Sequence, residues 1–237
     1  MKEKLIVALD KPDFAAAQKL IDRLGDTVVF YKVGLELFLN SRGAVIDYLK
    51  QQNRKIFLDL KFHDIPNTVA QAAKWAAGLG VDIFNVHAAG GADMLCKTVE
   101  AVKDITAQKG LPRPKVIGVT VLTSFSEEKF AQMGFKYSVN DTVVNWGRLC
   151  RKSGLDGVVC SAREAAFLKK ACGDDFLTVC PGIRPLWAPA QDQKRITTPQ
   201  EAIAGGADYI VVGRPITQHA DPDLAAQKVM MEMEEIK

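Results

Sequence analysis

The sequence predicts an α/β fold in which a single domain, residues 1–237, forms a closed (β/α)₈ barrel of the TIM type. Eight short runs of β-branched residues alternate with eight helix-like segments along the whole chain. The length of 237 residues is about what one such barrel needs, and no linker-like tract divides it. An open doubly wound sheet is the alternative architecture for the same alternation.

The predicted strands are short runs of apolar and β-branched residues, each followed by residues typical of turns or helix starts. They are Leu5–Asp10, Val28–Gly34, Ile56–Phe62, Ile83–Ala88, Val116–Thr123, Gly157–Ser161, Leu177–Ile183 and Tyr209–Arg214. The segments between them carry Ala, Leu, Lys and Glu in a helical pattern. These predicted helices are Asp13–Leu24, Leu35–Gln52, Thr68–Gly78, Ala92–Gln108, Asp141–Ser153, Ala162–Ala171, Pro199–Ala204 and Asp223–Glu235.

Two of the connections that follow predicted strands are longer than the rest, Thr123–Asn140 and Arg184–Thr198. The second mixes prolines with polar residues, so we expect a loop and consider it a candidate lid. Connections of this kind form the catalytic face of a (β/α)₈ barrel. We therefore expect the functional site at the carboxyl ends of the strands.

Charge and cysteine content narrow the classes of partner and compartment. The chain has 31 Lys+Arg and 28 Asp+Glu, a net charge of +3, and the two signs are interspersed, so neither nucleic acid nor a membrane surface is an expected partner. No uncharged apolar run is long enough to span a membrane. The five cysteines are odd in number and lack C-x-x-C spacing, so we expect free thiols and a cytoplasmic location.

Four charged residues are expected to converge at the mouth of the barrel. Alternation within Ile56–Phe62 places Asp59 and Lys61 on the inward side, because the apolar side must face the helices. Lys32 shares the inward side of its strand with Val28 and Phe30, and Asp10 ends the first strand. Buried opposite charges at this spacing keep each other ionised. A purely structural ion pair between Asp59 and Lys61 is the alternative.

A phosphate site is expected on the opposite side of the barrel mouth, because loops after the last two strands commonly hold phosphate in this fold. Gly213 lets an oxyanion approach the backbone, and Arg214 can pair with it through two hydrogen bonds. Arg184 and Gln193 lie in the preceding long loop and add donors. These four residues are the candidate phosphate ligands.

Histidine and cysteine spacing gives no sign of a metal site. His87 lies on the inward side of Ile83–Ala88 with Asn85, where a hydrogen-bonded core role is the alternative to catalysis, and we expect His63 and His219 in loops. No H-x-x-H, H-E-x-x-H or clustered Cys/His pattern occurs. We therefore expect no transition-metal site.

The string Asp59-Leu60-Lys61-Phe62-His63-Asp64-Ile65-Pro66-Asn67-Thr68 closely resembles the signature of the orotidine 5′-phosphate decarboxylase family, and the compact chain resembles its bacterial monofunctional type. The resemblance covers essentially the whole chain, with no departure at a motif position. It continues through Ala8-Leu9-Asp10, Tyr31-Lys32-Val33-Gly34, Val121-Leu122-Thr123-Ser124, Pro181-Gly182-Ile183-Arg184-Pro185 and Val212-Gly213-Arg214-Pro215-Ile216.

This resemblance implies decarboxylation of orotidine 5′-phosphate to uridine 5′-phosphate, the last step of pyrimidine nucleotide synthesis, without a metal or organic cofactor. It also implies a homodimer in which Asp64 and Thr68 reach into the neighbouring site. By the same resemblance, Asp10 and Lys32 bind the ribose hydroxyls, and Lys32 also stabilises the other charged groups. Asp59 lies beside the departing carboxylate, and Lys61 protonates the carbon that the carboxylate leaves. The pyrimidine edge contacts Thr123 and Ser124, and the phosphate is surrounded by Arg184, Gln193, Gly213 and Arg214.

Two other functions fit parts of the same pattern. Sugar-phosphate decarboxylases and aldolase-like synthases of the same superfamily share D-x-K-x-x-D and bind magnesium, but they resemble one another in placing an acid where this chain has Lys32. An ammonium group there repels a divalent cation. A barrel that has kept nucleotide binding and lost its chemistry is the other alternative, although Lys32, Asp59, Lys61 and Asp64 are all present here.

Overall fold

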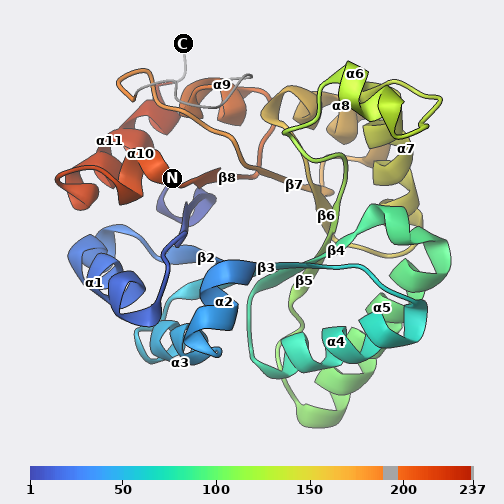
Figure 1. Cartoon of the computed structure of the whole chain (residues 1–237), viewed down its shortest axis with the longest axis horizontal. Helices are drawn as coiled ribbons and strands as arrows, with labels where there is room; N and C mark the ends of the chain where they lie inside the picture. The colour runs from blue at the N-terminus through green and yellow to red at the C-terminus, as the bar shows by residue number, and fades with distance from the viewer. Residues whose placement is uncertain (189–196, 236–237) are drawn as a thin grey trace.

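The computed structural model of this protein describes residues 1–188 and 197–235, in which eight parallel strands close into a barrel with helices around it (Figure 1). The strands are β1 (Leu5–Ala8), β2 (Phe30–Gly34), β3 (Lys55–Phe62), β4 (Ile83–His87), β5 (Lys115–Val119), β6 (Gly157–Val159), β7 (Leu177–Cys180) and β8 (Tyr209–Val212). Each strand pairs with its neighbours in sequence, and β8 pairs with β1. The predicted closed barrel is confirmed, and the open sheet is excluded.

The helices lie on the outside of the barrel, between successive strands. They are α1 (Phe14–Leu24), α2 (Leu35–Ser41), α3 (Ala44–Gln51), α4 (Pro66–Gly78), α5 (Gly91–Lys109), α6 (Glu127–Gln132), α7 (Val139–Lys152), α8 (Ala162–Cys172), α9 (Pro199–Ala204), α10 (Arg214–Thr217) and α11 (Pro222–Glu234), with single 3₁₀ turns η1 (Lys2–Lys4), η2 (Gly25–Thr27) and η3 (Ala88–Gly90). Several begin at a side-chain cap. Ser161 and Thr198 each form a capping box, in which Glu164 and Glu201 return the hydrogen bond.

Strand alternation divides the apolar residues between two cores. In β1, Leu5 and Val7 pack outward against the helices, whereas Ile6 points into the barrel. The barrel interior is a separate cluster made of Ile6, Ala8, Phe30, Phe57, Ile83, Ile117, Val179 and Val211. Val28, which we expected on the inward side with Lys32, precedes β2 and packs in the outer core instead. Asp59 and Lys61 lie nearer the carboxyl end of β3 than Phe57, which belongs to this cluster.

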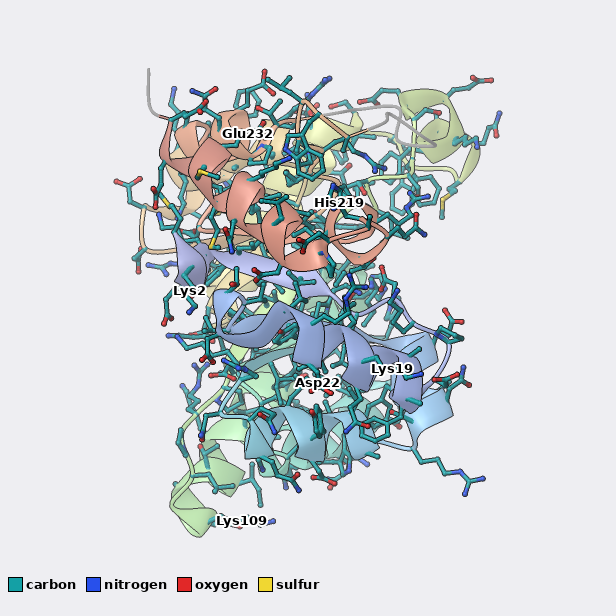
Figure 2. The ribbon with its side chains drawn as sticks, turned by 90° about the vertical axis from the view of Figure 1, so that its left-hand side faces the viewer. Lys2, Lys19, Asp22, Lys109, His219 and Glu232 are labelled. Carbon is teal, nitrogen blue, oxygen red and sulfur yellow. The ribbon has the colours of Figure 1, made fainter. Side chains whose placement is uncertain are left out.

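Helix α1 lies against the segment that leads into α11 and against α11 itself. Arg23, just before the end of α1, donates a hydrogen bond from Nη2 to the Ala220 carbonyl at 2.6 Å. Figure 2 shows α11, which carries Glu232, lying beside α1, which carries Lys19 and Asp22, and the two helices are in contact. The ring of helices thus closes where β8 meets β1, so the first and last strands contribute to one continuous rim.

The structure corrects several predicted boundaries. The predicted helix Leu35–Gln52 is two helices, because Arg42 and Gly43 adopt left-handed conformations with φ of 49° and 82°. The strand predicted over Val116–Thr123 begins one residue earlier and ends at Val119. Two short helices were also missed. The connection Thr123–Asn140 contains α6, which Ser126 caps, and the predicted end of the last strand at Arg214 is instead the start of α10.

Two further expectations concern membranes and thiols. Within residues 1–188 and 197–235, no helix is both long and apolar enough to cross a bilayer. All five cysteines are free, as the sequence led us to expect. Cys160 and Cys180 are the nearest pair, with 3.8 Å between their sulfur atoms.

Candidate active site

The four charged residues predicted to converge do so at the carboxyl ends of the first three strands. Lys61 Nζ lies 2.6 Å from Asp59 Oδ1, and Lys32 Nζ lies 3.4 Å from Asp59 Oδ2. Lys32 Nζ also contacts Asp10 Oδ1 at 3.1 Å. The contacts form a chain, Asp10 to Lys32 to Asp59 to Lys61, in which carboxylates and ammonium groups alternate. We call these four residues the charge cluster.

Lys32 and Asp59, in the middle of the charge cluster, are its most buried side chains, so water screens their attraction least. The side chains of Lys32 and Asp59 are 13% and 11% exposed, against 37% for Lys61 and 59% for Asp10. Burial alone lowers the pKa of Lys32, but the carboxylates of Asp59 and Asp10 outweigh it and raise that pKa above its usual value. Lys32 is therefore a fixed positive charge between two carboxylates.

An irregularity in β3 directs Lys61 into the site. The pairing of β3 with β4 passes from Leu58 opposite Phe84 to Phe62 opposite Val86, so β3 contains extra residues at this point. Lys61 lies within the irregularity and adopts a left-handed conformation with φ of 53°, which is uncommon for a lysine. Its backbone N–H donates to the side-chain oxygen of Asn85 at 2.8 Å.

Asn85 is the site residue that the sequence reasoning missed. It lies in β4, is fully buried, and donates from Nδ2 to Asp59 Oδ1 at 2.7 Å. Its inward position in the strand was visible in the sequence as an amide within the apolar run Ile83–His87. The neighbouring His87 is half-buried, and its ring contacts that of His63 with 5.1 Å between centroids.

Two adjoining cavities at the barrel mouth are both lined by Lys32, Asp59 and Lys61. One cavity, of about 230 Å³, is lined by Lys32, Asp59 and Lys61 on one side and by Thr123 and Ser124 on the other. The second, of about 410 Å³, adds Asp10 and the residues that start α2. The structure therefore brings Thr123 and Ser124 to the same space as the charges, as their predicted contact with a bound ring requires.

Gly213, one of the candidate phosphate ligands, lies close to the charge cluster. A Cβ atom at this position would lie 3.5 Å from Asp10 Oδ2. Gly213 precedes α10, whose first residue is the half-buried Arg214. Arg184 is 4% exposed, and its backbone N–H donates to the Thr197 carbonyl. Gln193 lies outside the described residues.

The described start of the long loop after β7 rests on the C-terminal helices. The ring of Trp187 contacts that of His219, which is labelled in Figure 2, with 5.7 Å between centroids. Lys228 Nζ lies 5.8 Å from the centre of the same indole ring. The described start of the loop thus lies beside His219, which follows α10, and beside α11, which carries Lys228.

Asp64 and Thr68 lie on the surface of this single chain. Both are exposed, in the turn before α4 and in the first turns of that helix. Asp64 Oδ1 accepts the N–H of Ile65 at 2.6 Å. In the part of the chain that the structure describes, no ion pair joins Asp64 to the charge cluster.

The described residues also contain no group of three or more His, Cys, Asp or Glu side chains arranged to hold a metal ion. Near the charge cluster, the two carboxylates already contact ammonium groups. These groups favour binding of an anionic ligand at the open edge of the cluster.

Comparisons with known proteins agree on one family. A model of the orotidine 5′-phosphate decarboxylase / HUMPS family matches residues 3–229. The chain belongs to this family. A relative from Nostoc sp. named orotidine 5′-phosphate decarboxylase is 50% identical over 232 residues, which cover 98% of this chain and 97% of the relative. A relative of the same name from Moorella thermoacetica is 47% identical over 100% of this chain and 94% of its own.

The family fold is also known from experiment. The crystal structure of orotidine 5′-phosphate decarboxylase from Lactobacillus acidophilus matches with a TM-score of 0.85 and 41% sequence identity, covering 97% of this chain and 98% of that one. The family resemblance seen in the sequence is thereby confirmed.

Proposed function

We propose that this protein converts orotidine 5′-phosphate to uridine 5′-phosphate and CO₂. The charge cluster carries the proposal: Lys61 Nζ lies 2.6 Å from Asp59, in a cavity at the catalytic face of a barrel of this family. The relatives that match nearly the full chain bear the name of this decarboxylase. The last step of pyrimidine nucleotide synthesis is therefore the activity that we expect.

Lys61 is the group that this chemistry requires. Breaking the bond between C6 of the pyrimidine and its carboxylate leaves the electron pair in an in-plane orbital, where the ring π system cannot delocalise it. A preorganised cation beside C6 stabilises that charge as it develops. Lys61 then transfers a proton from Nζ to C6, which completes uridine 5′-phosphate. This reaction demands a barrier reduction near the upper end of the ~8–23 kcal/mol that enzymes commonly supply.

Asp59 has two tasks in this scheme. Its Oδ1 accepts from Lys61 Nζ and orients the lysine, while its Oδ2 faces Lys32. When the substrate carboxylate lies beside it, the two like charges repel each other, and loss of CO₂ relieves that repulsion. Lys32 places a second counter-charge beside the buried Asp59 carboxylate.

The remaining predicted residues bind the substrate. We assign the ribose hydroxyls to Asp10 and Lys32, which line the larger cavity, and the pyrimidine edge to Thr123 and Ser124, which line the smaller one. The 5′-phosphate is assigned to the group Arg184, Gln193, Gly213 and Arg214. Binding energy from this remote group orders the substrate at the reacting end.

We further propose a homodimer in which Asp64 and Thr68 enter the partner's site. Exposed apolar side chains support such an interface: Leu39 of α2 is 61% exposed and Ile65, beside Asp64, is 67% exposed. Trp75 of α4 is 43% exposed and contacts Phe38 of α2, which joins these surfaces into one face.

Mixing two inactive variants tests the shared site. Lys61→Ala removes a group from a subunit's own site, whereas Asp64→Asn removes one from its partner's site. Random reassociation then yields heterodimers with one intact site, which should restore about one quarter of the wild-type activity. Failure of the mixture to regain activity, while sedimentation shows mixed dimers, would contradict the exchange of Asp64.

The activity itself is tested by treating the protein with EDTA, adding orotidine 5′-phosphate and following the loss of its ultraviolet absorbance. We expect rapid loss that added magnesium does not alter. Turnover of a pentulose or hexulose phosphate only with magnesium would instead place the protein in the sugar-phosphate branch. Tight nucleotide binding without turnover would identify a binding protein that has lost the reaction.

A further inference from the structure

Asn85 joins the two residues on which the proposed chemistry depends. It lies in the middle of β4 and is 0% exposed. Its oxygen accepts the backbone N–H of Lys61 at 2.8 Å, and its Nδ2 donates to Asp59 Oδ1 at 2.7 Å. A buried amide is costly unless its groups are hydrogen-bonded, and here both ends of the amide are used within the site.

The bond to Lys61 supports an unusual backbone. At the irregularity in β3, Lys61 has a φ of 53°, a backbone conformation that residues other than glycine rarely adopt. The Asn85 oxygen satisfies the Lys61 N–H where the regular pairing between β3 and β4 is interrupted. Without it, we expect the Lys61 backbone to relax and to withdraw its ammonium group from the cavity.

The bond to Asp59 fixes the orientation of the carboxylate. Asp59 Oδ1 accepts from both Asn85 Nδ2 and Lys61 Nζ, while Oδ2 faces Lys32. Three donors from three different strands therefore hold one carboxylate. Because β4 belongs to the barrel wall, Asn85 is the donor whose own position depends least on the flexible side chains around it.

We propose that Asn85 is a positioning residue, whose amide holds the Asp59 carboxylate and the Lys61 backbone in the geometry that places the Lys61 ammonium against the reacting carbon. This inference rests on the proposed function and names one more residue that it needs. The amide supplies both a donor for Asp59 and an acceptor for Lys61 from a single short side chain that carries no charge.

Two substitutions of similar size test the proposal. Asn85→Leu removes both hydrogen bonds, and Asn85→Asp keeps the acceptor but replaces the donor with a second carboxylate oxygen. We expect kcat at pH 7.5 to fall by about 100-fold in each, because misplacement of a reacting group by about 1 Å costs this much. The KM and the Kd for uridine 5′-phosphate should stay within about threefold of wild type, since Asn85 is not placed against the nucleotide.

The pH dependence of Asn85→Asp provides a rescue that a merely structural role would not give. A protonated Asp at this position regains a donor for Asp59 and an acceptor for Lys61. The ratio of its kcat to that of wild type should therefore rise by about tenfold or more as the pH falls from 7.5 to 5.5. The titratable groups that face it, Asp59 and Lys61 of β3, Lys32 of β2, and the rings of His63 and His87, are present in both proteins, so the ratio isolates the new carboxyl group.

Thr178→Val is the matched control. Thr178 is also fully buried in a barrel strand, and its hydroxyl bonds to the Gly206 carbonyl and Asp208 near the opposite end of the barrel. This variant should lower the Tm but keep the wild-type kcat. If Asn85→Leu fails to fold, the pH ratio of Asn85→Asp still decides the matter.

The possible outcomes distinguish failure of the positioning role of Asn85 from failure of the proposed decarboxylase activity. A folded Asn85→Leu with kcat within about threefold of wild type, or an Asn85→Asp ratio that does not change with pH, would overturn the positioning role and leave the decarboxylase intact. A wild-type protein without turnover of orotidine 5′-phosphate would overturn both.

Discussion

Lys32 and Asp59 face each other from neighbouring strands, with 3.4 Å between Lys32 Nζ and Asp59 Oδ2. The same ammonium group contacts Asp10, and the same carboxylate contacts Lys61. Lys32 therefore connects Asp10, on the ribose-binding side of the proposed site, with Asp59, on its reacting side. A divalent cation at this point would meet a positive charge that is already paired with both carboxylates.

Removing the Lys32 ammonium group should destabilise the fold as well as the site. Lys32→Met keeps the length of the side chain but leaves the buried carboxylate of Asp59 without one of its counter-charges. We predict that the free energy of unfolding in urea falls by about 3 kcal/mol, as is typical when one partner of a buried pair is lost. Lys55→Met, which removes an exposed contact with Glu3, is the control and should change it by less than about 1 kcal/mol. Equal effects of the two variants would contradict the role of Lys32.

Arg214 should matter only for substrates that carry the phosphate. Arg214→Ala is predicted to lower kcat/KM for orotidine 5′-phosphate by about 10- to 100-fold, the value of one or two hydrogen bonds between charged groups. The reaction of orotidine, which lacks the phosphate, should be unchanged by the same substitution. Arg151→Ala, which breaks a surface contact with Asp175, is the matched arginine control. An equal loss with both substrates would show that Arg214 acts elsewhere.

His87 should make the protein less stable below neutral pH. Burial, followed by the nearby His63 and Lys61, lowers the pKa of His87 below its usual value of 6.5, although Asp59 opposes this. As the pH falls below about 6.5, the unfolded chain binds a proton at this histidine more readily than the native protein does. The free energy of unfolding should therefore decrease from pH 7.5 to pH 5.5, and His87→Gln should make that decrease smaller. Parallel curves for the two proteins would contradict this assignment.

Gly157, at the start of β6, should be one of the least replaceable residues of the barrel wall. A Cβ atom there would lie 2.3 Å from the Leu177 carbonyl oxygen and 2.5 Å from its Cβ, both in the neighbouring strand β7. We predict that Gly157→Ala lowers the free energy of unfolding by about 3 kcal/mol, because the strand backbones must separate.

The same substitution at Gly78 provides the comparison. Gly78 is an exposed helical residue of α4, where an added Cβ would come no nearer than 3.8 Å to its closest neighbour, Lys109 Nζ. Gly78→Ala should be neutral or stabilise the protein by up to about 1 kcal/mol. Thermal unfolding of the two variants is sufficient to compare them, and a tolerated Gly157→Ala would show that β6 and β7 can move apart at little cost.

The sequence predicted the charge cluster because it depends on regular features. Side chains alternate strictly along a strand, so Asp59 and Lys32 had to face inward once their apolar neighbours faced the helices. A parallel barrel then brings the carboxyl ends of successive strands to one rim. Those two rules suffice for the proximity of Asp10, Lys32 and Asp59, whereas the position of Lys61 also depends on the irregularity in β3.

Irregular features were beyond the reach of the same rules. The left-handed backbone of Lys61 and its bond to Asn85 arise where β3 and β4 lose register, which depends on pairing between distant segments and not on local pattern. The break between α2 and α3 at Arg42 and Gly43 had a local signal, since glycine there permits the positive φ that ends a helix. The proposed reach of Asp64 and Thr68 into a partner concerns two chains and rests on the family resemblance.

The central claim is that Lys61 stabilises charge at C6 and supplies its proton, and kcat/KM for orotidine 5′-phosphate in Lys61→Ala tests it most directly. Lys115→Ala, an exposed lysine at the start of β5, is the matched control and should keep wild-type kinetics. We predict that Lys61→Ala loses at least about 10⁴-fold in kcat/KM, the combined value of electrostatic and general-acid catalysis, while it still binds uridine 5′-phosphate. A folded Lys61→Ala that keeps kcat/KM within about tenfold of wild type would contradict the account.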